Sequence, residues 1–251
     1  MNLFDLSDRS VIVTGAGRGI GRALALGLAQ AGANLVICAR SRSELESLAN
    51  QVEQMGRKAL VAVTDIRQRD QVDGMVQAAL AQYGCIDILV NNVGIALPQP
   101  AEQITEEAWD EVVDTNLKGT FFVSQAVARA MISRRRGVII NLASELAFVA
   151  LPGYACYSAT KAGIVMLTRA LAAEWARYGI RVNAVAPAAV QTEANSVLAT
   201  EDDRAQALAR LPIGRFGSVQ DMVGAVIYLA SDAASYVLGE TIMVDGGRVI
   251  I

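Results

Sequence analysis

The sequence of 251 residues contains no histidine. Serine–histidine and cysteine–histidine catalysis, a histidine general base and histidine metal ligands are therefore excluded. Lysine is scarce as well, because it occurs only as Lys58, Lys118 and Lys161. Proton chemistry has to come from tyrosine, lysine, carboxyl groups or cysteine, and we predict no metal site.

Paired cysteines and membrane-spanning runs are also missing. Cys38, Cys85 and Cys156 are far apart, odd in number and outside any CxxC pair, a pattern typical of reduced thiols in a cytosolic protein. No stretch reaches the roughly 18 continuous apolar residues of a transmembrane helix. The opening segment MNLFDLSDRS lacks the basic and apolar regions of a signal peptide. These absences predict a cytoplasmic protein without a membrane partner.

The charge balance excludes another class of partner. The net charge is −3, and the only dense basic cluster is the run of three arginines at 134–136. A helix end explains that cluster better than a phosphate site does, so we predict no nucleic-acid binding. Apolar residues make up 53% of the chain, which is enough for a sizeable core.

Apolar runs alternate with segments of helical period along the chain. The runs are continuously apolar, as parallel strands covered on both faces are, and the alternation is typical of βαβ units. We predict one domain over residues 1–251, a doubly wound α/β fold of Rossmann type with a seven-stranded, mainly parallel sheet and helices on both faces. Predicted strands cover about 10–14, 34–39, 58–63, 86–92, 137–144, 180–187 and 241–244, and predicted helices cover about 19–31, 42–55, 68–82, 107–133, 154–178 and 219–230.

Residues 191–212 interrupt this rhythm. The segment QTEANSVLATEDDRAQALARLP is polar, weakly helical and flanked by prolines. We therefore predict an insertion that covers the substrate site, and not a part of the sheet.

Ser144, Tyr157 and Lys161 are the leading candidates for chemistry. Side chains four residues apart in a helix lie on one face, so Lys161 would stand next to Tyr157. A phenol titrates near about pH 10, and a close ammonium group lowers such a pKa by roughly 1–3 units. Tyr157 could then act as acid and base, with Ser144 as a hydrogen-bond donor. Spacing alone also allows an ordinary tyrosine and lysine on a surface helix.

A glycine-rich segment follows the first predicted strand and opens the first predicted helix. Residues 14–21 are TGAGRGIG, and such glycines allow a tight turn and the approach of a pyrophosphate to the helix N-terminus. This context predicts a dinucleotide site. The spacing is GxxxGxG and not the commoner GxGxxG, and glycines also mark plain turns.

The end of the second predicted strand indicates which dinucleotide binds. NAD sites usually have an acidic residue there for the ribose 2′-hydroxyl, whereas this chain has Arg40 and Ser41. A guanidinium suits a 2′-phosphate, and Arg18 in the glycine loop could approach the same group. We predict NADP(H) as the preferred cofactor, with NAD(H) as the alternative if the two arginines are simply solvated.

Six motifs in this order make the chain resemble a short-chain dehydrogenase/reductase over nearly its whole length. They are TGxxxGIG at 14–21, NNxG at 91–94, Asn116, the set of Ser144, Tyr157 and Lys161, PxxVxT at 187–192 and VDGG at 244–247. The resemblance implies a nicotinamide-dependent oxidoreductase that reduces a ketone to a secondary alcohol or catalyses the reverse reaction. It also implies a homotetramer.

The resemblance further implies a role for each matching residue. Asn116 would hold a water in a proton relay to Lys161, and Lys161 would bind the nicotinamide ribose and lower the pKa of Tyr157. Asn91 would steady the fourth strand and the cofactor, Asp65 would touch the adenine, and Val190 and Thr192 would bind the carboxamide. The implied catalytic residues are Asn116, Ser144, Tyr157 and Lys161. The implied cofactor contacts are Gly15, Arg18, Gly19, Ile20, Gly21, Arg40, Ser41, Asp65, Ile66, Asn92, Gly94, Tyr157, Lys161, Pro187, Val190 and Thr192.

Two positions depart from the family pattern. Val93 replaces the usual alanine of NNAG, which is a modest steric change. Ala188 replaces the usual glycine after Pro187, and alanine is disfavoured if that backbone needs a positive φ.

The substrate side is less specific in sequence. Candidate substrate contacts are Ser144, Glu145, Leu146, Tyr154 and Tyr157, with Ile95, Ala147, Leu151, Ala189 and the 191–212 insertion around them. Glu145 either hydrogen-bonds a hydroxylated substrate or faces solvent. The small-molecule carbonyl or alcohol substrate is a 3-oxoacyl thioester or, as the alternative, a sugar or polyol oxidised with NAD. A non-catalytic NADPH-binding regulator is the remaining alternative, and the complete set of four catalytic residues argues against it.

Overall fold

The computed structural model describes residues 2–191 and 201–251, so the predicted cofactor contact Thr192 lies outside the described residues. Seven strands form one sheet in the order β3-β2-β1-β4-β5-β6-β9, with every pairing parallel. The order reverses between β1 and β4, which makes the sheet doubly wound as predicted. The strands are β1 (Ser10–Thr14), β2 (Asn34–Ala39), β3 (Ala59–Val63), β4 (Ile88–Asn91), β5 (Gly137–Leu142), β6 (Ile180–Pro187) and β9 (Thr241–Val244).

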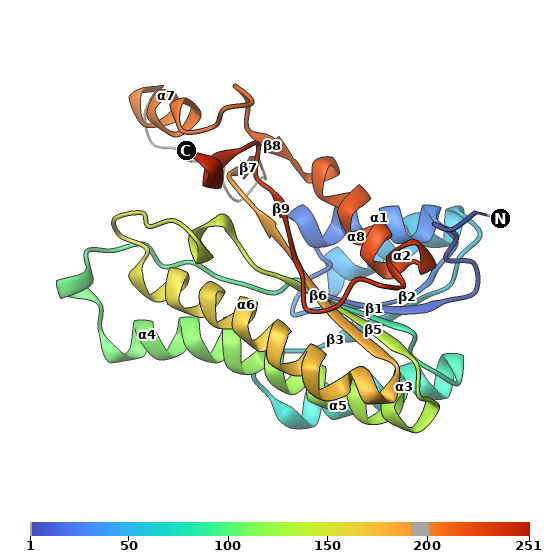
Figure 1. The fold of residues 1–251 in the computed structure, drawn as a ribbon. Coiled ribbons are helices and arrows are strands. Elements are labelled where there is room, and N and C mark those ends of the chain that lie inside the picture. Colours follow the sequence, from blue (N-terminus) through green and yellow to red (C-terminus); the bar gives the residue numbers. More distant parts are fainter. Residues whose placement is uncertain (1, 192–200) are drawn as a thin grey trace.

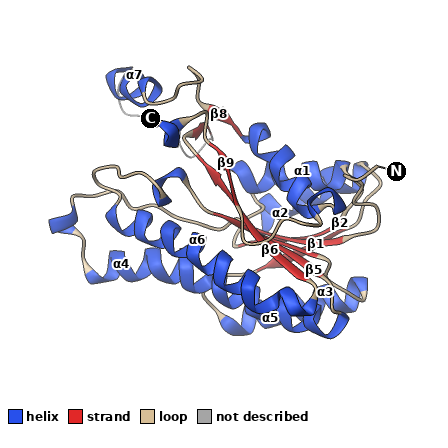
Figure 2. Ribbon diagram, in the orientation of Figure 1, coloured by secondary structure: helices blue, strands red, loops and turns tan. Residues whose placement is uncertain are grey.

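Helices cover both faces of this sheet (Figure 1, Figure 2). One face packs against α1, α2 and α8, and the other against α3, α5 and α6. The helices are α1 (Gly19–Gln30), α2 (Arg42–Gln54), α3 (Arg69–Tyr83), α4 (Glu106–Val113), α5 (Thr120–Arg134), α6 (Ala155–Trp175), α7 (Glu201–Ala209) and α8 (Val223–Ala230).

The central strand shows why the strand sequences are apolar without alternation. Val11 and Val13 of β1 lie in the core on the α1 side, while Ile12 lies in the core on the α3 side. All three are 0% exposed. Burial of one such side chain contributes about 1.5–3 kcal/mol, so both helical layers are stabilised through each strand.

Several predicted boundaries differ from the structure. The predicted helix over 107–133 is broken by a π-helical turn at Asp114–Gly119. The predicted helix over 154–178 ends as α6 at Trp175, and a 3-10 turn follows to the left-handed residue Gly179. The predicted fifth strand ends at Leu142, two residues before Ser144.

Within the predicted insertion at 191–212, the described residues 191 and 201–212 are not part of the main sheet. Gln191 pairs with Ser218 in a second, two-stranded sheet of β7 (Val190–Gln191) and β8 (Gly217–Ser218), which the sequence did not predict. The helix α7 supports the weakly helical character predicted for this insertion. Among the described residues, no helix has both the length and the apolar character needed to cross a bilayer.

Candidate active site

The predicted site residues come together at the carboxyl ends of the parallel strands. The glycine loop follows β1, Asn92 follows β4, Ser144 follows β5 and Pro187 ends β6. Because all strands of the sheet are parallel, these ends share one edge, and the reversal between β1 and β4 opens a crevice there. Residues scattered over most of the chain are thereby gathered into one site.

Ser144 lies in an extended segment between β5 and a 3-10 turn at Glu145–Ala147. Its side-chain oxygen accepts a hydrogen bond of 3.1 Å from the backbone N–H of Leu146. A hydroxyl group that accepts this bond still has its own proton to donate. Ser144 is 7% exposed and also forms a hydrogen bond with Tyr157.

Lys161 is the most deeply buried cation of the site. It is 3% exposed, and its Nζ donates a 2.7 Å hydrogen bond to the carbonyl oxygen of Leu142, the last residue of β5. Its Nζ lies 5.6 Å from the ring centroid of Tyr157, one helical turn earlier on α6. Burial lowers the pKa of Lys161 from 10.5 to about 8, because a low-dielectric surrounding disfavours the ammonium form.

Tyr157 does not show the lowered pKa that its neighbour Lys161 predicts. Burial raises the pKa of Tyr157 from 10.0 to about 12, although a hydrogen bond with Ser144 acts in the opposite direction. The charges of Glu145 and Tyr154 add to the increase. Desolvation therefore outweighs the other influences here, and the phenol keeps its proton at neutral pH. This state suits an acid that protonates a reduced carbonyl oxygen.

Asn116 sits in the π-helical turn that sequence periodicity did not predict. Its Oδ1 accepts from the N–H of Ile95 at 2.8 Å, and its Nδ2 donates to the Ile95 carbonyl at 2.9 Å and to Thr160 Oγ1 at 3.1 Å. A π-helical turn inserted into an α-helix often marks a functional site. The turn is held by these side-chain bonds, and they join the loop after β4 to α6.

Gly94 lies against both Lys161 and Asn116. A Cβ atom on Gly94 would stand 3.2 Å from Lys161 Nζ and 3.6 Å from Asn116 Oδ1. The missing Cβ therefore lets Gly94 pack closely against these two polar side chains.

The glycine loop is shaped by its neighbours as well as by its own residues. Gly15 has φ +65°, and a Cβ atom on Gly21 would collide with the Gly15 carbonyl oxygen. Asn92 Nδ2 donates to the carbonyl oxygens of Thr14 and Gly15, each at 3.1 Å. The side-chain amide of Asn92, a predicted cofactor contact, therefore stabilises the glycine loop. The backbone of the loop could then contact a pyrophosphate.

The neighbouring residue Asn91 has a purely internal arrangement. Its Nδ2 donates to Ser124 Oγ at 2.8 Å and to Asn141 Oδ1 at 2.9 Å, while Asn141 donates to Thr168 at 2.9 Å. This buried ladder fastens β4 to β5 and to helices α5 and α6. Ile66, another predicted cofactor contact, buries its side chain beside Gly119 and is 4% exposed.

Two exposed arginines lie where the adenosine end of the cofactor is predicted to bind. Arg18 precedes α1 and Arg40 follows β2, and the side chain of neither forms a hydrogen bond or ion pair with another described residue. Ser41 caps α2, and its side chain accepts from the Glu44 N–H. Asp65 is bound by Arg67 at 2.6 Å, and this hydrogen bond keeps the pKa of Asp65 below its usual value. The arginines are thus available to an anion.

The loop after β6 accommodates its unusual alanine. Asp8 and Arg135 are the non-glycine residues with positive φ in the described part of the chain. Ala188 therefore has an ordinary backbone, and the strain that a glycine-specific conformation would cause does not arise. Val190, 5% exposed, leads into β7.

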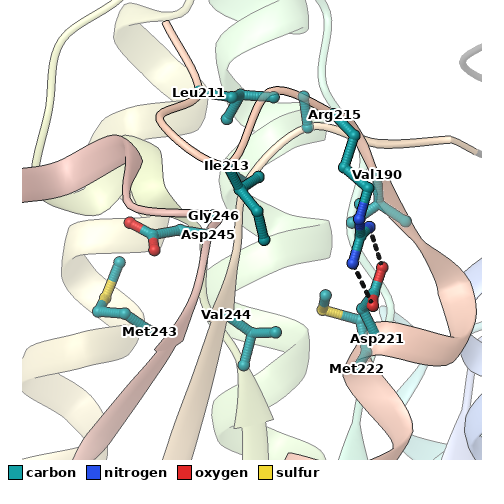
Figure 3. A pocket seen from close by; sticks show the side chains of 13 residues that line it. Val190, Leu211, Ile213, Arg215, Asp221, Met222, Met243, Val244, Asp245 and Gly246 are labelled. Carbon is teal, nitrogen blue, oxygen red and sulfur yellow. Dashed lines mark hydrogen bonds and ion pairs between the residues drawn. The ribbon is translucent and has the colours of Figure 1, made fainter. Parts of the chain in front are cut away.

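A cavity of about 250 Å³ lies beside this loop (Figure 3). Arg215 and Asp221 form an ion pair of 2.7 Å at one side of it, and Asp245 lies on the other side of Ile213. The wall includes Leu211 from the predicted insertion but neither Ser144 nor Tyr157. The cavity adjoins the predicted carboxamide position and is not the place of proton transfer.

The sequence did not decide whether Glu145, on the substrate side, contacts a substrate or faces solvent. Glu145 is half-buried, and burial raises its pKa from 4.5 to about 7. Arg248 and Asp245 act on the same carboxyl group. Sequence reasoning gave neither a role at this site, although the VDGG motif contains Asp245 and ends directly before Arg248. Tyr154 packs edge-on against Tyr157 with ring centroids 6.2 Å apart, whereas the predicted contact Leu146 is 8% exposed.

The described residues form no candidate metal site. Residues 2–191 and 201–251 contain no group of three or more side chains of the metal-binding types that could hold an ion.

Comparison with known proteins places the chain in a family. A family model described as enoyl-(acyl carrier protein) reductase matches residues 15–248. Gluconate 5-dehydrogenase of Gluconobacter oxydans is 43% identical over 247 residues, which are 98% of this chain and 96% of that protein. The chain belongs to the short-chain dehydrogenase/reductase family.

Other members of the short-chain dehydrogenase/reductase family differ in the substrates that their names state. The 3-oxoacyl-[acyl-carrier-protein] reductase of Staphylococcus epidermidis is 40% identical over 96% of this chain and 98% of that protein. A crystal structure of gluconate 5-dehydrogenase from Burkholderia cenocepacia in complex with NADP and tartrate has a TM-score of 0.96 and 42% identity, covering 100% of this chain and 98% of that one. Family membership makes the protein an oxidoreductase that acts on CH–OH and C=O groups.

Proposed function

We propose that the protein is an NADP(H)-dependent oxidoreductase that interconverts a ketone and a secondary alcohol, with Tyr157 as acid and base. The observation that carries this proposal is the arrangement of Ser144, Tyr157 and Lys161. Ser144 has a hydroxyl group in hydrogen-bond contact with Tyr157, Tyr157 keeps its phenol proton, and Lys161 is buried one turn away. A reductase needs a proton donor and an oxyanion stabiliser at one position, and these residues supply both.

The residues present fit a dinucleotide. The positive φ of Gly15 and the missing Cβ of Gly21 let the loop fold tightly onto the start of α1, and a helix N-terminus suits a pyrophosphate. When bound, the nicotinamide supplies the hydride. Lys161 is placed to hold the ribose hydroxyl groups, and the loop of Pro187 and Val190 to hold the carboxamide.

Proton transfer then falls to the side chains of the chain itself. In reduction, the Ser144 hydroxyl donates a hydrogen bond to the substrate oxygen, and Tyr157 gives its proton to that oxygen as negative charge develops there. In oxidation, Tyr157 takes the proton back. Asn116 holds the loop that carries Ile95 against α6 and so keeps the wall behind Lys161 in place.

Arg18 and Arg40 support NADP(H) as the cofactor. Both are exposed and unpaired within the described residues, and the end of β2 has no carboxylate. The relative from Burkholderia cenocepacia was crystallised with NADP.

Arg40→Ser tests the cofactor preference. The variant should raise the Kd for NADPH by roughly 10- to 100-fold, because a hydrogen bond to a charged group contributes about 1.5–3 kcal/mol. The Kd for NADH should change by less than about threefold, since NADH has no 2′-phosphate for the guanidinium. Fluorescence titration with each cofactor provides the measurement. Equal losses for both cofactors, or a wild-type preference for NADH, would contradict the assignment.

Two substrate classes are proposed for this site. A 3-oxoacyl thioester fits the apolar part of the site, and a hydroxylated substrate fits Glu145. A panel of ketones and secondary alcohols, followed by NADPH absorbance, tests the function as a whole. No turnover of any member with either cofactor would argue for a non-catalytic regulator.

We also infer a cytoplasmic homotetramer. Ile250 and Ile251 at the chain end are 83% and 70% exposed, and Met166 on α6 is 60% exposed. Apolar side chains exposed to this degree suit a subunit contact. Sedimentation equilibrium at micromolar concentration should give four times the 26.6 kDa chain mass, and a monomer mass would refute the assembly.

A further inference from the structure

Residues 211–221 follow α7 and contact the loop after β6; we call them the returning segment. Gly217 of this segment donates its N–H to the carbonyl oxygen of Ala189 at 3.0 Å, and it lies opposite Val190 in the two-stranded sheet. A Cβ atom on Gly217 would stand 3.3 Å from Val190 Cγ2. The backbone of Gly217 is therefore bonded to the loop that is proposed to hold the carboxamide.

The same loop is also bonded to the main sheet. Ala188 donates its N–H to the carbonyl oxygen of Val244, the last residue of β9, at 3.4 Å. The turn after β9 in turn contacts the returning segment, because Ile213 donates its N–H to the Gly246 carbonyl oxygen at 3.1 Å. A Cβ atom on Gly246 would stand 2.6 Å from Ile213 Cγ2, so the first glycine of the VDGG motif makes this contact possible.

One carboxylate fixes the shape of the returning segment (Figure 3). The two oxygens of Asp221 accept from the Arg215 guanidinium at 2.7 and 3.0 Å, and Oδ2 also accepts from the N–H and the hydroxyl of Ser218 at 2.7 and 2.9 Å. Ser218 Oγ accepts from the Asp221 N–H at 3.3 Å, which completes a capping box. Arg215 and Ser218 stand before and after Gly217 in the chain, so Asp221 binds the segment on both sides of it.

The contribution of this carboxylate is geometric. The side chains of Arg215 and Asp221 are 55% and 31% exposed, and the attraction within an exposed ion pair contributes little. Two parallel hydrogen bonds from a guanidinium to a carboxylate nevertheless fix the orientation of one group relative to the other. The hydrogen bonds from Arg215 and Ser218 keep the pKa of Asp221 well below its usual value, so the group stays ionised near neutral pH.

Close packing does not fix the loop after β6 on the side of the cavity. The cavity of about 250 Å³ has Ala188, Val190 and Asp221 in its wall. Side chains in a close-packed core hold one another in place, and the walls of a cavity lack such neighbours. The position of the loop therefore depends on hydrogen bonds, among them those with Val244 and Gly217.

We propose that Asp221 is a positioning residue for cofactor binding, which holds Gly217 against Ala189 and Val190 and thereby fixes the loop that receives the nicotinamide. Asp221 acts through Ser218 and Gly217 and not by contact with the cofactor. The inference rests on the proposed function, because it takes the loop after β6 as the carboxamide site.

Asp221→Asn tests the two halves of the cofactor separately. The variant keeps the shape of the side chain, but one oxygen becomes an NH₂ group that faces a donor of Arg215. The Kd for NADPH should rise by roughly 3- to 30-fold, the size of effect that a residue acting through its neighbours has. The Kd for 2′-phosphoadenosine 5′-diphosphoribose, which lacks the nicotinamide, should change by less than about twofold, because its binding groups share no partner with Asp221. Titration calorimetry measures both values.

Two further variants separate positioning from general effects. Arg215→Met should give the same pattern, and combining it with Asp221→Asn should add little, because both changes break one contact. Asp5→Asn is the matched control, since the Asp5 carboxylate likewise accepts from the N–H and the hydroxyl of a serine, Ser7, at 3.0 and 2.7 Å. It lies near the N-terminus and should change neither Kd.

Hydrogen exchange tests the proposed contact without any cofactor. The Gly217 N–H that is bonded to Ala189 should exchange at least about tenfold faster in Asp221→Asn, because the local opening of this contact becomes easier. The Val138 N–H, bonded to the Asp87 carbonyl oxygen at 2.9 Å, should keep its wild-type rate.

The outcomes distinguish this inference from the proposed function. Equal losses for NADPH and the fragment in Asp221→Asn, no loss for NADPH, or unchanged exchange at Gly217 would each overturn the positioning role and leave the proposed function standing. If the wild type binds NADH in place of NADPH, the same comparison with NADH and adenosine 5′-diphosphoribose decides. Failure of the wild type to bind either dinucleotide would refute the proposed function and this inference together.

Discussion

Tyr157→Phe should remove nearly all turnover and leave cofactor binding intact. The substitution deletes the phenol oxygen, and Ser144 alone cannot replace a group that both stabilises the oxyanion and delivers the proton. General acid catalysis contributes about 10²–10⁴-fold, so kcat should fall by roughly 10³-fold or more with an NADPH Kd within about twofold of wild type. Steady-state kinetics on a substrate confirmed for the wild type, combined with NADPH titration, measures both quantities.

The fold offers a matched control for this variant. Tyr236 lies in the loop before β9 and is fully exposed, so Tyr236→Phe makes the same chemical change away from the site. It should retain wild-type kinetics. Wild-type turnover by the purified Tyr157→Phe protein would show that another group acts as the acid, and the proposed mechanism would be wrong.

Lys161→Met should lower both turnover and cofactor affinity. Methionine has nearly the length of lysine but lacks the ammonium, so it loses the hydrogen bond to Leu142 and the donor proposed for the ribose. We expect kcat to fall by about 10²-fold or more and the Kd for NADPH to rise by about tenfold. The split between these effects distinguishes Lys161 from Tyr157, for which the Kd should not change.

Lys161→Met also tests how the burial of Lys161 affects the pH dependence of the free energy of unfolding. Its pKa is about 8 in the folded protein and 10.5 as the unperturbed value, so the unfolded chain binds more protons between these pH values. Because of this residue, the free energy of unfolding of the wild type should increase by on the order of 3 kcal/mol as the pH rises from 8 to 10.5. Urea unfolding at pH 7.5 and pH 10 should show this gain in the wild type and its loss in Lys161→Met. An identical pH dependence in the two proteins would contradict the burial of the amine.

Lys118→Met is the matched control for this comparison. Lys118 forms an exposed ion pair of 3.0 Å with Asp114, and exposed pairs contribute only about 0–1 kcal/mol. Its loss should change neither the pH dependence of stability nor turnover.

The strands were predictable because each is a local feature of the chain. Val11, Ile12 and Val13 are apolar in succession since both faces of β1 are buried, and this requirement is written directly into the sequence. The glycine loop was predictable for a similar reason, because Gly15 needs a positive φ and Gly21 must lack a Cβ. Both constraints act on residues that are neighbours in the chain.

The π-helical turn at Asn116 was not predictable from periodicity. It depends on hydrogen bonds from the Asn116 side chain to Ile95 and Thr160, which belong to other segments. The lowered pKa predicted for Tyr157 was wrong, and the reason is similar. The spacing to Lys161 was correct, but the depth of burial, which raises the pKa, is a property of the packed site.

The sequence by itself determined the fold class, the family and the residues that carry the proposed chemistry, because apolar runs, glycines and the Ser144, Tyr157 and Lys161 motif are local patterns. Only the tertiary structure brought Arg248 within electrostatic range of Glu145 and left both without a partner. These residues lie on loops after β9 and β5, and no local pattern specifies how two such loops meet. Their meeting follows from the packing of the whole sheet, and so the raised pKa of Glu145 could be read only from the folded chain.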